Sequence, residues 1–120
     1  NGKYALTHDD VLLLKVGRHF RVSDRVKLIV GRNERENNFL KLYEKGRHVF
    51  RIPDLPSAHV LAEVKGTLEK PDVERLASVA VRYSDAEKGA RVVVEHCHAD
   101  IIERVEASAI EDPTLDSWRV

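Results

Sequence analysis

Short stretches in which apolar and polar residues alternate recur along this chain, and they constrain its fold more than any other feature. Between Leu12 and Val22 the even-numbered residues are apolar, with Arg18 as the one exception. A period of two is typical of a β-strand with one buried face. Further strands are predicted at residues 26–30, 48–52, 59–65, 91–95 and 101–110, although the last stretch is ambiguous between strand and helix.

Two other stretches have apolar residues at helical spacing. Asn33 and Glu36 stand where a capping box belongs, which predicts a helix over residues 34–45. Pro71 suits the first turn of a second helix, predicted over residues 72–84, and an irregular tail is expected from Asp112. The predicted fold class is α+β, with two helices packed on a mostly antiparallel sheet in the order β-β-α-β-β-α-β-β. The helix residues expected in the core are Phe39, Leu40, Tyr43, Val73, Leu76, Ala77, Ala80 and Val81.

The length of 120 residues predicts one domain. No stretch approaches the roughly 20 apolar residues of a membrane span, and the polar start does not resemble a signal peptide. A single cysteine, Cys97, fits a reducing cytoplasm. Because the chain does not begin with methionine, we expect it to be a C-terminal fragment of a longer protein.

The charge is unevenly distributed, although the net charge is zero. Residues 1–60 hold 12 Lys and Arg against 7 Asp and Glu, whereas residues 61–120 hold 8 against 13. The excess is largest over residues 15–51, with 11 basic against 4 acidic residues. A folded chain with one basic region can bind an anionic partner there, while the acidic half is expected to face away. A solvated charged surface is the alternative.

The strongest candidate for anion binding is the segment that follows the second predicted strand. Gly31 lets the backbone approach a ligand closely, and the following helix would point free N–H groups outward. Arg32 and Arg35 flank this position and are suited to clamp a phosphate. A simple capped helix start with surface arginines is the alternative interpretation.

Basic residues also share strand faces. Lys15, His19 and Arg21 fall on one side of the first predicted strand, and Arg47 and Arg51 on one side of the third. A cationic sheet face without a central aromatic residue favours the phosphate backbone of folded RNA over splayed single strands. Cations that merely keep an exposed sheet face soluble are the alternative.

Catalytic motifs do not emerge from the sequence. Phosphate-binding, dinucleotide-binding and nucleophile-elbow motifs are absent, so no cofactor is predicted. His96 and His98 would share one strand face with Cys97 on the other, which leaves too few ligands for a structural zinc. Two nucleophilic sites are formally possible: a pair of Cys97 with a histidine, and a Ser-His-Asp set of Ser57, His59 and Asp54. The three residues of the second set lie too close together in sequence to favour the geometry of a triad.

Four motifs follow one another in a specific order along the chain. They are Leu13-Leu14-Lys15-Val16-Gly17-Arg18-His19-Phe20-Arg21, Val30-Gly31-Arg32-Asn33 with Asn37, Asp54-Leu55-Pro56-Ser57-Ala58-His59-Val60, and Arg82-Tyr83-Ser84. This ordered set resembles the NFACT-R family of RNA-binding domains over roughly residues 6–97. It is similar in particular to the version at the C-terminus of bacterial and archaeal PP-loop ATPase proteins related to tRNA thiouridine synthases.

The resemblance implies a domain that binds tRNA or structured RNA for a PP-loop ATPase domain in the same chain or a partner, with RNA contacts at Gly31, Arg32, Asn33, Asn37 and His59. The chain departs from the family at Arg47, Val49 and Arg51, where Asp, Trp and His are usual, and at Pro56-Ser57-Ala58-His59, where Pro-Gly-Pro-His is usual. The full set of predicted RNA-binding residues is Lys15, Arg18, Arg21, Gly31, Arg32, Asn33, Arg35, Asn37, Arg47, Arg51 and His59.

The sequence therefore predicts a cytoplasmic, non-catalytic RNA-binding domain without metal. Two other functions stay open. One is a protein-interaction or dimerisation module that uses the acidic half or the tail around Leu115 and Trp118. The other is a small metal-dependent enzyme built on His96 and His98.

Overall fold

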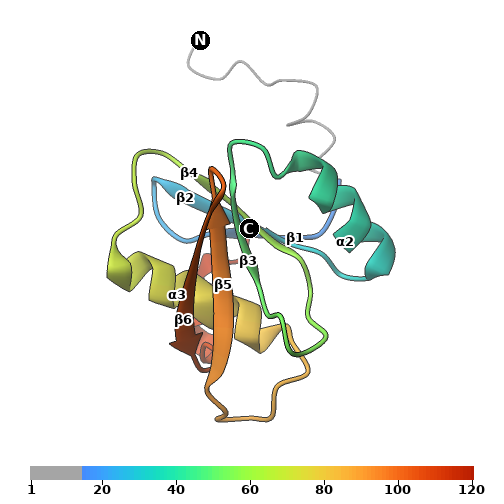
Figure 1. The fold of residues 1–120 in the computed structure, drawn as a ribbon, viewed down its shortest axis with the longest axis vertical. Helices are drawn as coiled ribbons and strands as arrows, with labels where there is room; N and C mark the ends of the chain where they lie inside the picture. The colour runs from blue at the N-terminus through green and yellow to red at the C-terminus, as the bar shows by residue number, and fades with distance from the viewer. Residues whose placement is uncertain (1–14) are drawn as a thin grey trace, which may run out of the picture.

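Six antiparallel strands form one sheet within residues 15–120, the part of the chain that the computed structural model describes (Figure 1). Their order across the sheet is β1-β2-β4-β3-β5-β6. The strands are β1 (Arg18–Arg21), β2 (Val26–Val30), β3 (His48–Arg51), β4 (Val60–Val64), β5 (Val92–His98) and β6 (Ile101–Ala107). The helices are α2 (Glu34–Leu40) with a following 3-10 turn η1 (Lys41–Tyr43), α3 (Lys70–Arg82) and α4 (Asp112–Trp118). This architecture confirms the predicted α+β class.

Helices cover both faces of the sheet. Successive residues of a strand point to opposite sides, so each face supplies side chains to a core of its own. On one face, Leu76 and other residues of α3 belong to the same core as Leu28 and Phe50. On the opposite face, Leu40 of α2 packs with Ile29 in a smaller second core. The sheet therefore separates two cores of unequal size.

The central strand β4 contributes to both cores. Its first three residues, Val60, Leu61 and Ala62, are fully buried. Val60 and Ala62 belong to the core under α3, whereas Leu61 belongs to the core under α2. A strand that is buried on both faces needs a continuous apolar run, and this is the pattern seen here.

The first strand is shorter than predicted. Gly17 has a φ of +78°, and a Cβ there would lie 2.7 Å from the carbonyl oxygen of Val30. This left-handed conformation places residues 15–17 in a turn, so the extended segment begins at Arg18. Residues 12–14 of the predicted strand lie outside the described residues.

Both predicted helices are present, with shifted ends. The first tightens after Leu40 into η1, and Gly46 follows with a φ of +78°, so regular α-helix covers only part of residues 34–45. The second begins at Lys70 because Glu69 and Asp72 form a reciprocal capping box around Pro71. No helix within residues 15–120 is long and apolar enough to cross a membrane.

The expectation of an irregular tail is wrong. Residues from Asp112 form α4, with Pro113 in the first turn, where its missing N–H costs nothing. Leu115 is 1% exposed and belongs to the core under α3, so it is not available as an interaction surface. The chain end then pairs with β1, where the N–H of Val120 donates to the carbonyl of His19 at 3.1 Å.

The second half of the sheet ends in a long hairpin. The predicted strand at residues 91–95 extends to His98, and the ambiguous segment from Ile101 is a strand paired with it, as predicted, ending at Ala107. Ala99 and Asp100 connect the two strands with φ values of 50° and 67°.

Leu76→Ala tests the assignment of the core under α3. Leu76 is 1% exposed, so the truncation should lower the free energy of unfolding by about 2–5 kcal/mol. Leu42→Ala is the matched control, because Leu42 is 74% exposed and should change stability by less than about 0.5 kcal/mol. Equal effects of both variants in urea denaturation would contradict this assignment.

Candidate functional site

Three of the residues implied by the family resemblance lock the turn between β2 and α2 onto the start of β4. The N–H of Gly31 donates to the carbonyl of His59 at 3.1 Å, and the side-chain oxygen of Asn37 accepts from the N–H of His59 at 2.9 Å. A Cβ on Gly31 would collide with that oxygen of Asn37. Glycine is therefore required for this close approach, and all three residues have a structural task.

Arg32 is held by an acidic partner on α2. Its guanidinium donates to both carboxylate oxygens of Glu36, at 3.0 and 2.8 Å, and its backbone N–H donates to the same carboxylate at 2.9 Å. Asn33 caps the helix by accepting from the N–H of Glu36 at 2.9 Å. The hydrogen bond from Arg32 is the main reason that the pKa of Glu36 falls to about 2, with a further contribution from the backbone of Gly17.

This arrangement changes the interpretation of the proposed anion clamp. Arg32 already binds a carboxylate, which offsets its charge and leaves fewer of its N–H groups for a phosphate. Arg35 is exposed and makes no hydrogen bond or ion pair within the described residues. Lys15 is also exposed, in the turn that donates to Glu36 through Gly17.

The expected basic sheet face is an alternating set of ion pairs. Arg47 lies 3.3 Å from Glu63 of β4, and Arg51 lies 2.9 Å from Glu95 of β5. Glu95 also faces Arg104 of β6 at 3.4 Å. The hydrogen bond from Arg51 holds the pKa of Glu95 below its usual range.

The expectation that the acidic second half faces away from the basic first half is therefore wrong. The cause is the strand order, which places β4 and β5 on either side of β3. Arg21 belongs to the same sheet face, where it stands across from Lys27 of β2, and it is exposed.

Arg18 points to the other side of the sheet. Its guanidinium lies 5.1 Å from the ring centre of Tyr83, at the end of α3, and the guanidinium of Arg82 lies 5.7 Å from the same ring. Arg82 also pairs with Asp112 at 2.9 Å. The structure thus does not bring Arg18 together with Arg21, Arg47 and Arg51.

His59 is nearly buried beneath η1. Its Nε2 lies 2.8 Å from a carboxylate oxygen of Glu44, which follows η1. Burial lowers the pKa of His59, and the nearby Glu44 carboxylate opposes that shift. With 8% of its surface exposed, His59 offers little area to an RNA ligand without movement of Glu44.

A cluster of four nearly parallel rings, called the ring stack below, was not predicted from the sequence. In it His48 stacks on His98 and lies edge to edge with His96, to which it is hydrogen bonded. His96 and His98 share one strand face, as predicted, but His48 of β3 joins them. Ring centres are 4.7 Å apart for Phe50 and His96, 5.0 Å for His96 and His48, and 3.7 Å for His48 and His98. The period-two spacing of His48 and Phe50 was the available signal, but it does not reveal which strand lies beside them.

The histidine nitrogens are directed at one another. Nδ1 of His48 and Nε2 of His96 are hydrogen bonded at 2.7 Å. Burial is the main reason that the pKa of His48 falls to about 4, and the other two imidazoles lower it further. Within residues 15–120, no group of three or more metal-ligating side chains is arranged to hold a metal ion.

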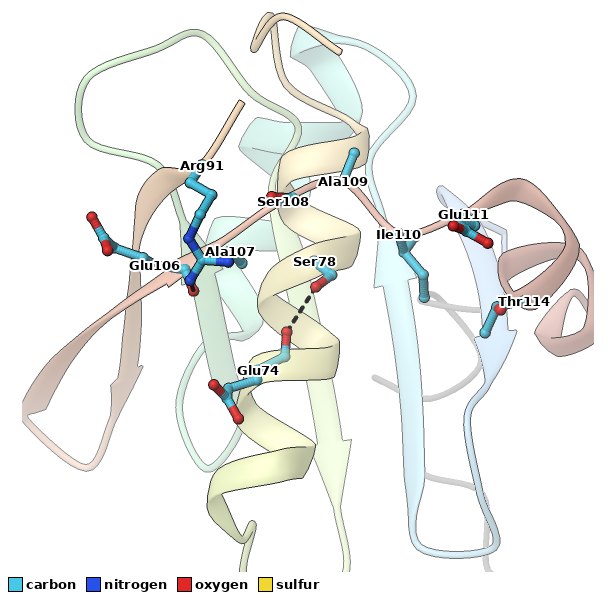
Figure 2. A pocket seen from close by; sticks show the side chains of 10 residues that line it. All are labelled: Glu74, Ser78, Arg91, Glu106, Ala107, Ser108, Ala109, Ile110, Glu111 and Thr114. Atoms are coloured by element: carbon cyan, nitrogen blue, oxygen red, sulfur yellow. Dashed lines mark hydrogen bonds between the residues drawn. The ribbon is translucent and has the colours of Figure 1, made fainter. Parts of the chain in front are cut away.

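A polar groove of about 400 Å³ lies between α3, the end of β6 and the start of α4 (Figure 2). Its groups serve the fold: the hydroxyl of Ser78 donates to the carbonyl of Glu74, and Arg91 donates to the carbonyl of Glu106. These two side chains of the groove are therefore bonded to the backbone and not to a carboxylate.

The nucleophilic sets considered from the sequence are likewise not assembled. Ser57 forms a β-bridge with Ser84, while the ring of His59 faces Glu44. Cys97 packs on the core under α2, on the opposite sheet face from the histidine stack.

The model of the NFACT protein RNA binding domain matches residues 17–119. No curated protein matches the chain. The fold is similar to the C-terminal part of the fibronectin/fibrinogen-binding protein from Streptococcus suis, with a TM-score of 0.74 and 18% identity. That alignment covers 88% of this chain and 49% of the other, so the chain spans about half the length of the solved structure.

Glu36→Gln tests the ionic lock at the start of α2. Because the folded-state pKa of Glu36 lies near 2 and its ordinary value is 4.5, the carboxylate stabilises the fold above pH 4.5, and this contribution disappears as the pH falls toward 2. The variant should unfold at lower denaturant concentration at neutral pH, and its stability should decline less on acidification.

Glu34→Gln is the matched control, since Glu34 is an exposed carboxylate in the same helical turn. It should leave the pH dependence of unfolding unchanged. An equal change in both variants would show that Glu36 has no special role.

Proposed function

The chain belongs to the family of NFACT protein RNA binding domains, and we propose that it binds tRNA or another structured RNA as a non-catalytic accessory domain. The family match over residues 17–119 carries this proposal, because it spans every described strand and helix. Support also comes from the exposed cations of the first half of the chain.

We further propose that the domain positions tRNA for a PP-loop tRNA-thiolation enzyme, either fused to it or a separate partner in the cytoplasm. The motif pattern of the sequence supports this branch of the family, notably Arg47 and Arg51 in place of the more usual residues. The chemistry would then belong to the PP-loop domain, while this chain supplies affinity and orientation.

The proposed phosphate-binding surface follows the turn before β1, β1 itself and the first turn of α2. Lys15, Arg21 and Arg35 are exposed there. Exposed cations with no competing carboxylate can neutralise phosphates at little cost, and phosphate contacts supply most of the affinity of such complexes.

The paired arginines have a secondary role in this proposal. Arg32, Arg47 and Arg51 each face a carboxylate at 3.3 Å or less, which offsets their positive charge and reduces what RNA gains from them. Arg18, stacked on Tyr83, serves the opposite face. The remaining predicted residues Gly31, Asn33, Asn37 and His59 act by shaping the turn that presents Arg35.

Filter binding with tRNA at several salt concentrations tests the proposed surface. Affinity should fall steeply with salt, with a slope of about −0.7 to −0.9 per neutralised phosphate. The double variant Arg21→Ala, Arg35→Ala should bind more weakly and flatten that slope by up to about two units, since it removes two phosphate contacts.

Lys88→Ala is the control, because this exposed cation lies in the loop before β5, outside the proposed surface. It should leave both affinity and slope unchanged. An unchanged double variant would show that the surface is misplaced. If the parent chain shows no salt-sensitive RNA binding, the proposed function fails and a protein-interaction module becomes the better explanation.

A further inference from the structure

A small cavity lies where the ring stack meets the loop after β4. Its volume is about 180 Å³. Three imidazoles line one side, from His48, His96 and His98, and residues 66–68 line another. Side chains of Ile101 and Glu103 from β6 complete it. None of these residues belongs to the proposed phosphate-binding surface.

We propose that this cavity binds one unpaired nucleobase of the RNA, stacked on the ring of His98; the inference rests on the proposed RNA-binding function. The four rings lie nearly parallel, with interplanar angles of 6°, 14° and 11° along the series Phe50, His96, His48 and His98. The series begins at a fully buried ring and ends at an exposed one. A planar ligand therefore extends an existing stack.

The size of the cavity favours a single ring system. At about 30 Å³ per molecule, it holds the equivalent of about six waters, well below the roughly 300 Å³ at which pockets for drug-sized ligands begin. A base extruded from an RNA bulge or loop fits this limit, while its sugar and phosphate stay outside. RNA-binding proteins commonly stack such bases on aromatic side chains, histidine included.

One polar group at the cavity is suited to read the edge of a base. The Nδ1 atom of His96 is fully buried, so it is not open to a ligand in the cavity. The carboxylate of Glu103, directly across from His96 on β6, can accept from an amino or imino group of the base.

The surrounding contacts make the site a preformed one. Arg25 donates to the carbonyls of Lys65 and Thr67, at 3.3 and 3.2 Å, and so holds the loop against the start of β2. The hydrogen bond between His48 and His96 fixes the two inner rings. It also occupies Nδ1 of His48 and Nε2 of His96, so these two nitrogens are not free to bind a metal.

The direct test uses two RNA hairpins that differ at one position of a single-nucleotide bulge, which carries either a base or an abasic ribose. Fluorescence anisotropy should show that the parent chain binds the base-containing hairpin about 5- to 150-fold more tightly, the range found for base–aromatic stacking. His98→Ala should abolish this preference, whereas His98→Phe should retain it.

A matched pair on β6 controls for surface apolarity. Ile101 and Ile102 are adjacent and exposed by 63% and 54%, but Ile101 lines the cavity and Ile102 points to the other face. Ile101→Ser should reduce the preference for the base, and Ile102→Ser should not. Far-ultraviolet circular dichroism of each variant confirms that it is folded.

A second measurement does not need a long RNA. Titration of the chain with uridine 5′-monophosphate should shift the imidazole Cε1–H NMR signals of His48, His96 and His98, and leave that of His59 unchanged. Shifts confined to other residues would overturn the proposed site.

The outcomes separate the two proposals. Binding of both hairpins with equal affinity by the parent chain, or an unchanged preference in His98→Ala, overturns the base site and leaves the proposed RNA-binding function standing. Failure to bind either hairpin at low salt overturns the RNA-binding function, and the base site with it.

Discussion

Burial of β4 on both faces is the constraint on which the rest of the structure depends. Val60 and Ala62 need cover from α3, and Leu61 needs it from α2 and η1. A helix as short as α2 has little stability of its own, so its position must come from tertiary contacts. The hydrogen bonds that join Gly31 and Asn37 to the backbone of His59 provide them, because they attach the start of α2 to the residue just before β4.

The order of the strands in the sheet decides which charged side chains meet. A linear count separates a basic first half from an acidic second half, but the sheet places β3 between β4 and β5. Glu63 and Glu95 therefore meet Arg47 and Arg51, and most of the positive charge of β3 is neutralised within the fold. What remains for an anionic partner is the exposed charge around β1 and α2. There β1 borders β2 on one side and the last residues of the chain on the other.

Sequence reasoning succeeded where the determining interactions are local. The N-cap residue Asn33 and the apolar face of α3 are set by neighbours within one or two turns, and both were identified correctly. The capping box expected at Glu36 is not formed, because its carboxylate accepts from the backbone N–H of Arg32 instead of that of Asn33. The helix α4 was missed although Pro113 marks its start. A single proline is a weak indication of a helix, and only two residues, Leu115 and Trp118, form the apolar face of α4.

Contacts between distant strands were beyond such reasoning. His48 and His96 are 48 residues apart in the sequence. Nothing in that spacing indicates that β5 lies beside β3 and brings the two imidazole rings together. The pairing of Arg51 with Glu95 has the same origin. Residues of the candidate site could thus be named from the sequence, while their partners, and hence their availability to a ligand, could not.

The interior role of the motif residues is consistent with a function in RNA binding. The turn that leads into α2 is built by Gly31, Asn37 and His59, and it has no room for a Cβ at residue 31. Any RNA contact made by Arg35 therefore depends on these residues indirectly. Such a site separates two tasks that nucleic-acid binding requires: phosphate contacts set position and affinity, whereas base contacts select. The cations near β1 and α2 suit the first task, and the ring stack between β3 and β5 suits the second.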